Sequence, residues 1–214
     1  MNEATKTKLI YGALFEPYLN GKILDIGAGK DPITKNADVF DKEQGNAQNI
    51  GEYLPSNSFD TVFSSHCLEH MHDPKTALFS WLELVKPGGY LIILVPDEDL
   101  YEQGHFPSKF NSDHKATFTI SKANSWSHNS INCLDLCTSL SAEIVYLSEQ
   151  SDNYDYKLQT HKKNGILRFP LIRHTLRLKV LAKLFRRLKL LPIDQTSTGK
   201  NVLAQICFIL KKSN

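Results

Sequence analysis

Lys22-Ile-Leu-Asp-Ile-Gly-Ala-Gly29 is a short apolar run that ends in two glycines. A run with so little polar alternation is typical of a strand covered on both faces, as in a parallel sheet. The glycines follow where the strand ends, and there a ligand can approach the backbone without meeting a side chain. The run therefore predicts a first parallel strand with a binding turn. Glycines that only turn the chain into a helix would give the same pattern.

The turn does not match a nicotinamide-binding fingerprint. That fingerprint needs a third glycine three residues after Gly29, and this chain has Pro32 there. Dinucleotide binding is therefore disfavoured.

Short apolar stretches bounded by polar residues predict further strands at 37–41, 59–65 and 90–95. Asp73-Pro74 supplies a cap and a first-turn proline for a helix over 75–85, which Lys86-Pro-Gly-Gly89 ends. Because helix and strand alternate, we expect an α/β fold with a doubly wound, mostly parallel sheet.

The second half of the chain is less regular. Gly, Pro, His, Asn and aromatic residues crowd residues 98–120, which we predict to be an active-site loop. A helix is expected at 121–140, followed by strands at 143–147 and 202–210. With 214 residues and 41% apolar content, the chain is expected to form one domain, residues 1–214.

The net charge of +2 hides an uneven distribution. Residues 156–193 hold eleven Lys or Arg and no Asp or Glu, leaving 14 basic against 23 acidic residues elsewhere. Within this segment, residues 178–188 place apolar and basic side chains on opposite sides of a helical wheel, so we expect a basic helical insertion before the last strand. Its basic face could be simply solvated, could recruit an anionic acceptor, or could bind anionic lipid. Nucleic acid is disfavoured because the remaining surface is acidic.

An ordered series of short motifs extends the first run. Asp41 ends the second strand, and four further motifs follow: Gly45-Asn-Ala-Gln48, Phe59-Asp60, Leu68-Glu-His70 and Lys86-Pro-Gly-Gly89. With this series the chain resembles the class I S-adenosylmethionine-dependent methyltransferases, in the subgroup with the Leu-Glu-His and Lys-Pro-Gly-Gly motifs. The resemblance implies that fold, with an antiparallel last strand. Only eighteen residues separate Asp41 from Asp60, so the usual third strand is expected to be vestigial or that edge of the sheet trimmed.

The resemblance also implies S-adenosylmethionine as cofactor. One carboxylate can accept from both hydroxyls of a ribose, a role that suits Asp41. Asp25 is expected to hold the glycine turn or the cofactor's amino group, and Asn46 stands where the family often has an adenine-binding acid. The residues expected at the cofactor are Asp25, Gly27, Ala28, Gly29, Asp41, Lys42, Asn46, Ala47, Ser64, Ser65 and His66.

Methyl transfer to a hydroxyl is favoured by a base or a divalent metal. We predict His114 as the base, Asp113 as its orienting carboxylate and His66 as the second candidate, whereas His70 is expected to cap or pack a helix start. Oxygen and imidazole ligands for a divalent cation are also available in this region, but their spacing matches no metal signature, and no metal ligands are predicted. This set consists of Asp97, Asp99, His105, Asp113 and His114.

The layout further resembles small bacterial methyltransferases of surface-polysaccharide synthesis. This resemblance implies O-methylation of a sugar hydroxyl on a nucleotide- or lipid-linked glycan, with an anionic acceptor. Another small-molecule acceptor, such as a lipid or secondary metabolite, and a non-catalytic module that docks through the basic helix are the alternatives. The N-terminus lacks the apolar core of a signal peptide, so we expect a cytoplasmic protein, with peripheral attachment to the inner face of the membrane as an option.

Overall fold

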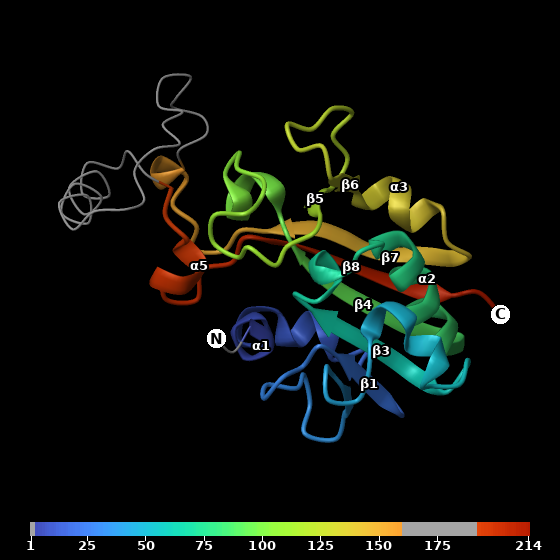
Figure 1. Cartoon of the computed structure of the whole chain (residues 1–214). Helices are drawn as coiled ribbons and strands as arrows, with labels where there is room; N and C mark the ends of the chain where they lie inside the picture. The colour runs from blue at the N-terminus through green and yellow to red at the C-terminus, as the bar shows by residue number, and fades with distance from the viewer. Residues whose placement is uncertain (1–2, 160–191) are drawn as a thin grey trace.

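The computed structural model describes residues 3–159 and 192–214, which form an α/β fold around one six-stranded sheet (Figure 1). The strand order is β2-β1-β3-β4-β8-β7. The strands are β1 (Ile23–Ile26), β2 (Asp38–Phe40), β3 (Phe59–Ser65), β4 (Val85–Pro96), β7 (Ala142–Gln150) and β8 (Gln205–Lys212).

The first four strands of this sheet run parallel, and β8 runs antiparallel between β4 and β7. This arrangement confirms the expected doubly wound, mostly parallel sheet with an antiparallel last strand. The register pairs Ile26 with Ser64 and Ser64 with Ile93. The carboxyl ends of β1, β3 and β4 therefore meet at one edge of the sheet.

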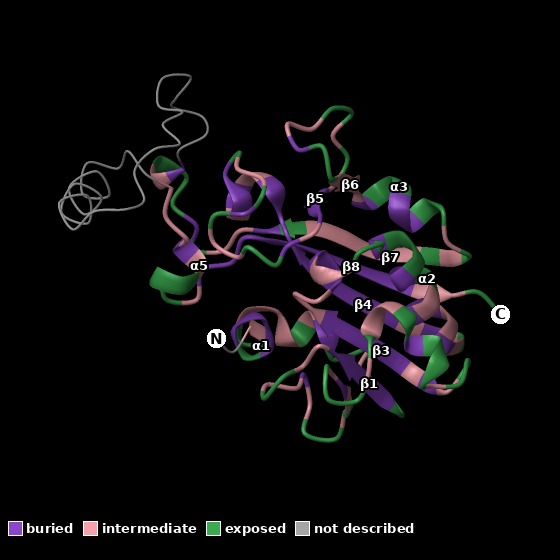
Figure 2. Ribbon diagram, viewed as in Figure 1, coloured by how far each residue is buried: buried purple, intermediate pink, exposed green. Residues whose placement is uncertain are grey.

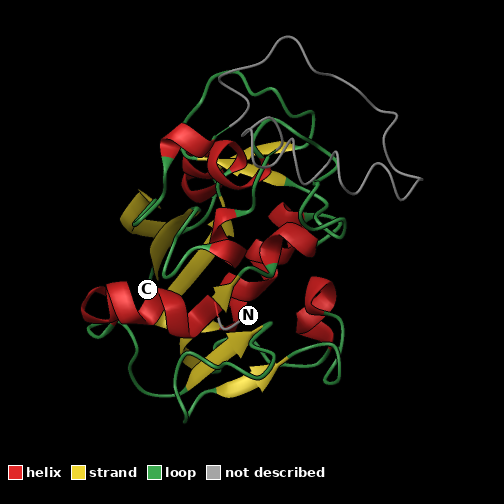
Figure 3. Ribbon diagram, turned by 90° about the vertical axis from the view of Figure 1, so that its left-hand side faces the viewer, coloured by secondary structure: helices red, strands yellow, loops and turns green. Residues whose placement is uncertain are grey.

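Alternating residues of the strands belong to two apolar cores, one on each face of the sheet. Figure 2 shows that the central strands β3 and β4 are mostly buried, and Figure 3 shows the helices beside the strands. On one face Leu91 and Ile93 pack with helices α2 (Pro74–Leu84) and α3 (Cys133–Thr138). On the other face Ile92 and Leu94 pack with α1 (Glu3–Phe15). This two-residue alternation places helices on both sides of the sheet.

The predicted trimming near the third strand is confirmed. Between β2 and β3, residues 41–58 are all described, and they form a 3₁₀ helix, η1 (Ala47–Glu52), and no strand. β2, only three residues long, is therefore the edge of the sheet.

The prediction of a helix over residues 121–140 is wrong. The chain instead forms an irregular segment, then β6 (Ser130–Asn132) and the six-residue α3. Glu98 explains the difference, because its buried carboxylate binds the side chains of Lys122, Ser125 and Ser130. These side-chain bonds favour an irregular backbone over a helix in this segment.

The loop expected at 98–120 carries more structure than predicted. It begins with a one-turn π-helix, η3 (Glu98–Glu102), and includes β5 (Thr117–Thr119), which pairs parallel with β6. Helix α1 was not predicted from the sequence.

The basic insertion expected at 156–193 is described only at its flanks. η4 (Tyr156–Leu158) forms its first turn, and α5 (Gln195–Thr198) follows it. The amphipathic segment 178–188 lies outside the described residues. Among the helices that the structure describes, none has the length and apolar character needed to span a bilayer.

Candidate functional site

Two adjoining cavities open at the carboxyl edge of the parallel strands, where α/β folds bind ligands. The first has a volume of about 420 Å³ and lies over the turn after β1. The second, of about 230 Å³, lies beside the start of β8. Both are lined by Glu3 and His66, so one wall is shared.

The glycine turn after β1 forms the floor of the first cavity. Gly27 and Gly29 adopt φ values of +79° and +55°, in the left-handed region that favours glycine. A Cβ atom on Gly27 would lie 2.7 Å from the Cβ and Sγ atoms of Cys67. Both backbone conformation and space therefore require glycine at position 27, as the sequence indicated.

Asp25, in β1, stabilises the segment that follows this turn. Its buried carboxylate accepts a 2.7 Å hydrogen bond from the Ile33 N–H. Burial raises the pKa of Asp25 to about 7, although the bond from Ile33 opposes the change. Asp25 also lines the first cavity together with Gly27, Ala28 and Gly29, so these four predicted residues do come together.

Asp41 reaches the same turn from the end of β2. Its Oδ2 atom accepts from the Gly29 N–H at 2.8 Å and its Oδ1 atom from the Lys42 N–H at 2.7 Å. The carboxylate is partly exposed beside the turn, where a diol could reach it.

The next predicted residues stand further from the cavity. Asn46 caps η1 by accepting from the Gln48 N–H at 3.0 Å. The Ala47 carbonyl accepts from the indole N–H of Trp81 at 2.8 Å. The described residues that line the first cavity do not include Lys42, Asn46 or Ala47, nor Asp41, which reaches it only through its bond to Gly29.

The predicted residues at the end of β3 take three different positions. Ser64 donates to the Ile26 carbonyl at 2.9 Å inside the sheet, which is a structural role. Ser65 lines the first cavity, and its buried hydroxyl has no hydrogen-bond partner among the described residues. His66, with a φ of +54°, lies at the wall between the cavities.

Both ring nitrogens of His66 lie near acceptor oxygens. Nε2 lies 2.9 Å from the Gln205 side-chain oxygen, and Nδ1 lies 3.4 Å from Oε1 of Glu69. Gln205 presents its oxygen because its amide nitrogen donates to Thr7 and Gln150. Burial opposes charge on both His66 and Glu69, but their attraction outweighs it: the pKa of His66 is raised and that of Glu69 is lowered. These surroundings favour the protonated form of His66, which has no lone pair with which to take a proton from an acceptor.

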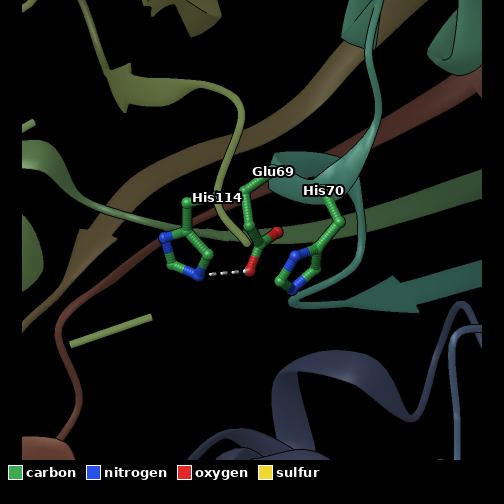
Figure 4. A group of neighbouring side chains, drawn as sticks. All are labelled: Glu69, His70 and His114. Atoms are coloured by element: carbon green, nitrogen blue, oxygen red, sulfur yellow. Dashed lines mark ion pairs between the residues drawn. The ribbon is translucent and has the colours of Figure 1, made fainter. Parts of the chain in front are cut away.

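His114 lies in the second cavity, with its side chain only 4% exposed (Figure 4). Its Nδ1 atom lies 2.6 Å from Oε1 of Glu102, and its Nε2 atom faces Oε1 of Glu69 at 3.9 Å. When Nδ1 donates to Glu102, Nε2 keeps its lone pair. The predicted histidine therefore has the orientation that a base needs.

The expected pairing of Asp113 with His114 is wrong. Asp113 is exposed, and its carboxylate lies 3.2 Å from Nδ1 of His70 and 3.3 Å from the Lys115 ammonium. Glu102, twelve residues before His114, orients the imidazole instead, because η3 turns its side chain inward.

The acids and histidines weighed as metal ligands are dispersed. Asp97 caps η3, Asp99 pairs with Lys122, and His105 lies 3.1 Å from the Lys109 ammonium. A different set converges among the described residues: Glu69, His70 and His114 each offer an atom within 4.8 Å of the others. Glu69 and His70 stand in the Leu-Glu-His motif, so the sequence held the signal for them. The sequence held no such signal for three other residues of the site, Glu3, Glu102 and Gln205.

Comparisons with known proteins agree with this geometry. The family model described as a methyltransferase domain matches residues 24–93. That segment carries the glycine turn, Asp41 and the Leu-Glu-His motif. No curated protein matches the sequence.

Solved structures extend the similarity over nearly the whole chain. A SAM-dependent methyltransferase from Archaeoglobus fulgidus is 16% identical, with a TM-score of 0.52 over 99% of this chain and 95% of its own. The YcgJ protein from Bacillus subtilis is 13% identical, with a TM-score of 0.51 over 95% of this chain and 97% of its own. An N-methyltransferase from Haemonchus contortus, solved with phosphomonomethylethanolamine and S-adenosylhomocysteine, is 14% identical, with a TM-score of 0.51 over 99% of this chain and 57% of its own. The chain therefore has the Rossmann-like fold of these methyltransferases.

Proposed function

We propose that the protein is an S-adenosylmethionine-dependent methyltransferase that acts on oxygen. The observation that carries the proposal is the pair of adjoining cavities, one over a glycine turn and one around an oriented histidine, with His66 and Glu3 in their common wall. Methyl transfer needs this arrangement, because donor and acceptor must approach in line to about 3 Å. The match of residues 24–93 to the methyltransferase domain supports the same function.

The first cavity fits the cofactor. Gly27 and Gly29 leave room at the backbone, and Asp41 offers a partly exposed carboxylate for a ribose diol. The unpartnered Ser65 hydroxyl and the Asp25 carboxyl add polar groups at the end expected to hold the methionine part. When bound, the cofactor supplies an electrophilic methyl group on a sulfonium.

His114 is the proposed base. A sugar hydroxyl has a high pKa, so removing its proton during attack favours the transfer. Nε2 of His114 faces Glu69, and both residues line the second cavity. Glu102 would stabilise the imidazolium that forms when Nε2 takes the proton. The arrangement resembles a carboxylate–histidine pair in which the carboxylate orients the base.

A sugar hydroxyl on a nucleotide- or lipid-linked glycan is the acceptor that we propose. Polar side chains suited to hydroxyl groups line the second cavity, namely Asn111, Thr196, Ser197 and Gln205. Its charged lining residues include the acids Glu3, Glu69 and Asp194 and, in the described part of the chain, no Lys or Arg. A neutral sugar suits that wall better than an anionic group does.

The anionic carrier would then stay outside, near the basic segment 156–193. Near the start of the segment, Gln159 donates to the Asp99 carbonyl at 2.6 Å, in the same helix η3 as Tyr101, which lines the second cavity. Directly after the segment, Asp194 lines the cavity. We propose that the segment attracts such a carrier, or the inner face of a membrane that presents it, in the cytoplasm. Flotation with phosphatidylglycerol liposomes, compared with phosphatidylcholine liposomes, tests the membrane part of this proposal.

Calorimetry with S-adenosylmethionine tests the cofactor. We expect binding, and we expect Asp41→Ala to weaken it by about 10- to 100-fold because two charge-assisted hydrogen bonds to the ribose are lost. Asp38→Ala is the matched control, since Asp38 is an exposed acid on the same strand. Absence of binding would overturn the proposal.

A transfer assay with a panel of nucleotide sugars tests the acceptor. His114→Ala should keep its affinity for the cofactor and lose turnover. Unchanged turnover in that variant would remove His114 as the base. Methylation of a lipid or secondary metabolite, but of no sugar, would leave the methyltransferase proposal standing and replace the acceptor.

A further inference from the structure

We infer that Glu69, His70 and His114 form a binding site for one divalent transition-metal ion in the second cavity (Figure 4). Two imidazole nitrogens and one carboxylate oxygen converge there, each within 4.8 Å of the others. All three residues line the cavity that we assign to the acceptor. The inference concerns binding of the ion, and only its link to the acceptor rests on the proposed function.

The Glu69 carboxylate is the first reason. It is 1% exposed, and neither of its oxygens accepts a hydrogen bond from any residue that the structure describes. Buried carboxylates are paired, hydrogen-bonded or bound to metals, because an unsatisfied buried charge is costly. The nearest ion-pair contacts of Oε1 are His66 at 3.4 Å and His114 at 3.9 Å.

The two histidines supply the second reason. Each has a carboxylate beside its Nδ1 atom: Glu102 at 2.6 Å from His114, and Asp113 at 3.2 Å from His70. In metal sites such outer carboxylates fix which ring nitrogen carries the hydrogen and turn the other nitrogen to the ion. Glu102 is thus a positioning residue for the site. Asp113 lies beside His70, but Nδ1 of His70 has no hydrogen-bond partner among the described residues.

The geometry needs only a small closure. Ligand distances of about 2.1 Å place neighbouring donor atoms roughly 3 to 3.5 Å apart. The donor atoms lie within 4.8 Å of one another, so a gap of that width must close by roughly 1.3 to 1.8 Å. His70, at the end of the Leu-Glu-His turn, has a side chain that is 25% exposed and so has room to move. Protein ligands at three positions would leave the remaining coordination positions open to the cavity.

The donor set also selects the class of ion. Two imidazoles with one carboxylate suit Mn²⁺, Fe²⁺, Co²⁺ or Zn²⁺, whereas Mg²⁺ and Ca²⁺ prefer oxygen ligands throughout. We therefore expect Co²⁺ and Zn²⁺ to bind more tightly than Mg²⁺.

The ion and direct proton transfer compete for one atom. With the ion bound, Nε2 of His114 is a ligand, so it accepts a proton only in the metal-free protein. If the acceptor is bound in this cavity, its oxygen can occupy an open coordination position. The competing explanation for Glu69 is that it serves only to pair with His66, and that explanation predicts no metal binding.

Titration of the full chain with Co²⁺ tests the site without cofactor or acceptor. The protein is purified through a tag without histidine, stripped with EDTA and dialysed. We expect one equivalent of Co²⁺ to produce visible absorption bands of nitrogen and oxygen coordination, Zn²⁺ to displace it, and the melting temperature to rise with either ion.

Variants locate the ion. Glu69→Gln and His70→Ala should each weaken Co²⁺ binding by at least about tenfold, and Glu102→Gln by about 10- to 100-fold. His72→Ala is the matched control, because His72 is an exposed histidine two residues from His70 that is not part of the group. If Glu69→Gln fails to fold, the partly exposed His70→Ala carries the test.

Absence of Co²⁺ binding, or binding that none of these variants weakens, would overturn the inference. Binding at this site together with failure to bind S-adenosylmethionine would uphold the metal site and overturn the proposed function. Cofactor binding without Co²⁺ binding would overturn the metal site and leave the proposed function standing.

Discussion

Asp25→Asn should change how the stability of the protein depends on pH. Asp25 is 1% exposed, and burial raises its pKa to about 7 in the folded state, compared with about 4 in an unfolded chain. Between these values the folded state holds a proton that the unfolded state releases. The free energy of unfolding therefore falls as the pH rises through this interval, by about 1.4 kcal/mol per pH unit from this group. The full cost above pH 7 is about 4 kcal/mol as an upper bound.

Urea unfolding of both proteins at about pH 5, 6, 7 and 8 measures this effect. The asparagine keeps an oxygen for the Ile33 N–H and cannot ionise, so the variant should gain stability relative to the parent as the pH rises. Asp97, whose pKa burial also raises to about 7, affects both proteins alike and cancels in the difference. A difference that stays constant over this range would refute the reasoning.

Three further substitutions test the site and its support. Glu102→Gln should lower kcat by about 10- to 100-fold and leave the affinity for S-adenosylmethionine unchanged, because it removes the charge that stabilises the protonated His114; equal loss in binding would contradict this. Glu98→Ala should lower the free energy of unfolding by about 3 to 5 kcal/mol, as measured by thermal unfolding. The fully buried carboxylate is the acceptor for Thr117, Lys122 and Ser130, and the variant leaves these groups without it. Trp81→Phe should cost about 1 to 3 kcal/mol in urea unfolding through the lost 2.8 Å bond to the Ala47 carbonyl; a neutral result would mean that water replaces the indole.

Local patterns were sufficient to predict the centre of the fold. β1 is fully buried, β3 is largely buried, and so is the second half of β4, residues 91–96. Their glycines and caps stand next to these apolar stretches in the chain. The short distance from Asp41 to Asp60 was enough to predict the trimmed edge, because a helix and a strand need more residues than the chain supplies. These features depend on neighbours in sequence.

The features that were missed depend on neighbours in space. Helix α1 has no apolar face clear enough to be recognised, and Leu9 within it is 69% exposed. The helix expected at 121–140 failed because Glu98 binds its serines from another element. In the same way Glu102 took the place predicted for Asp113, since η3 turns it toward His114. Proximity in sequence favoured Asp113, but the path of the chain decided the contact.

The antiparallel direction of β8 has a practical consequence for measurement. Gln205 pairs with Pro96 at the cavity edge of the sheet, and Lys211 pairs with Tyr90 at the opposite edge. The strand therefore leads the chain away from both cavities, and the two termini are well separated in Figure 1. Glu3, by contrast, lines both cavities. A sensor surface or fluorescent label attached after β8 should leave ligand entry undisturbed, whereas the same attachment ahead of α1 would stand at the mouth of the site.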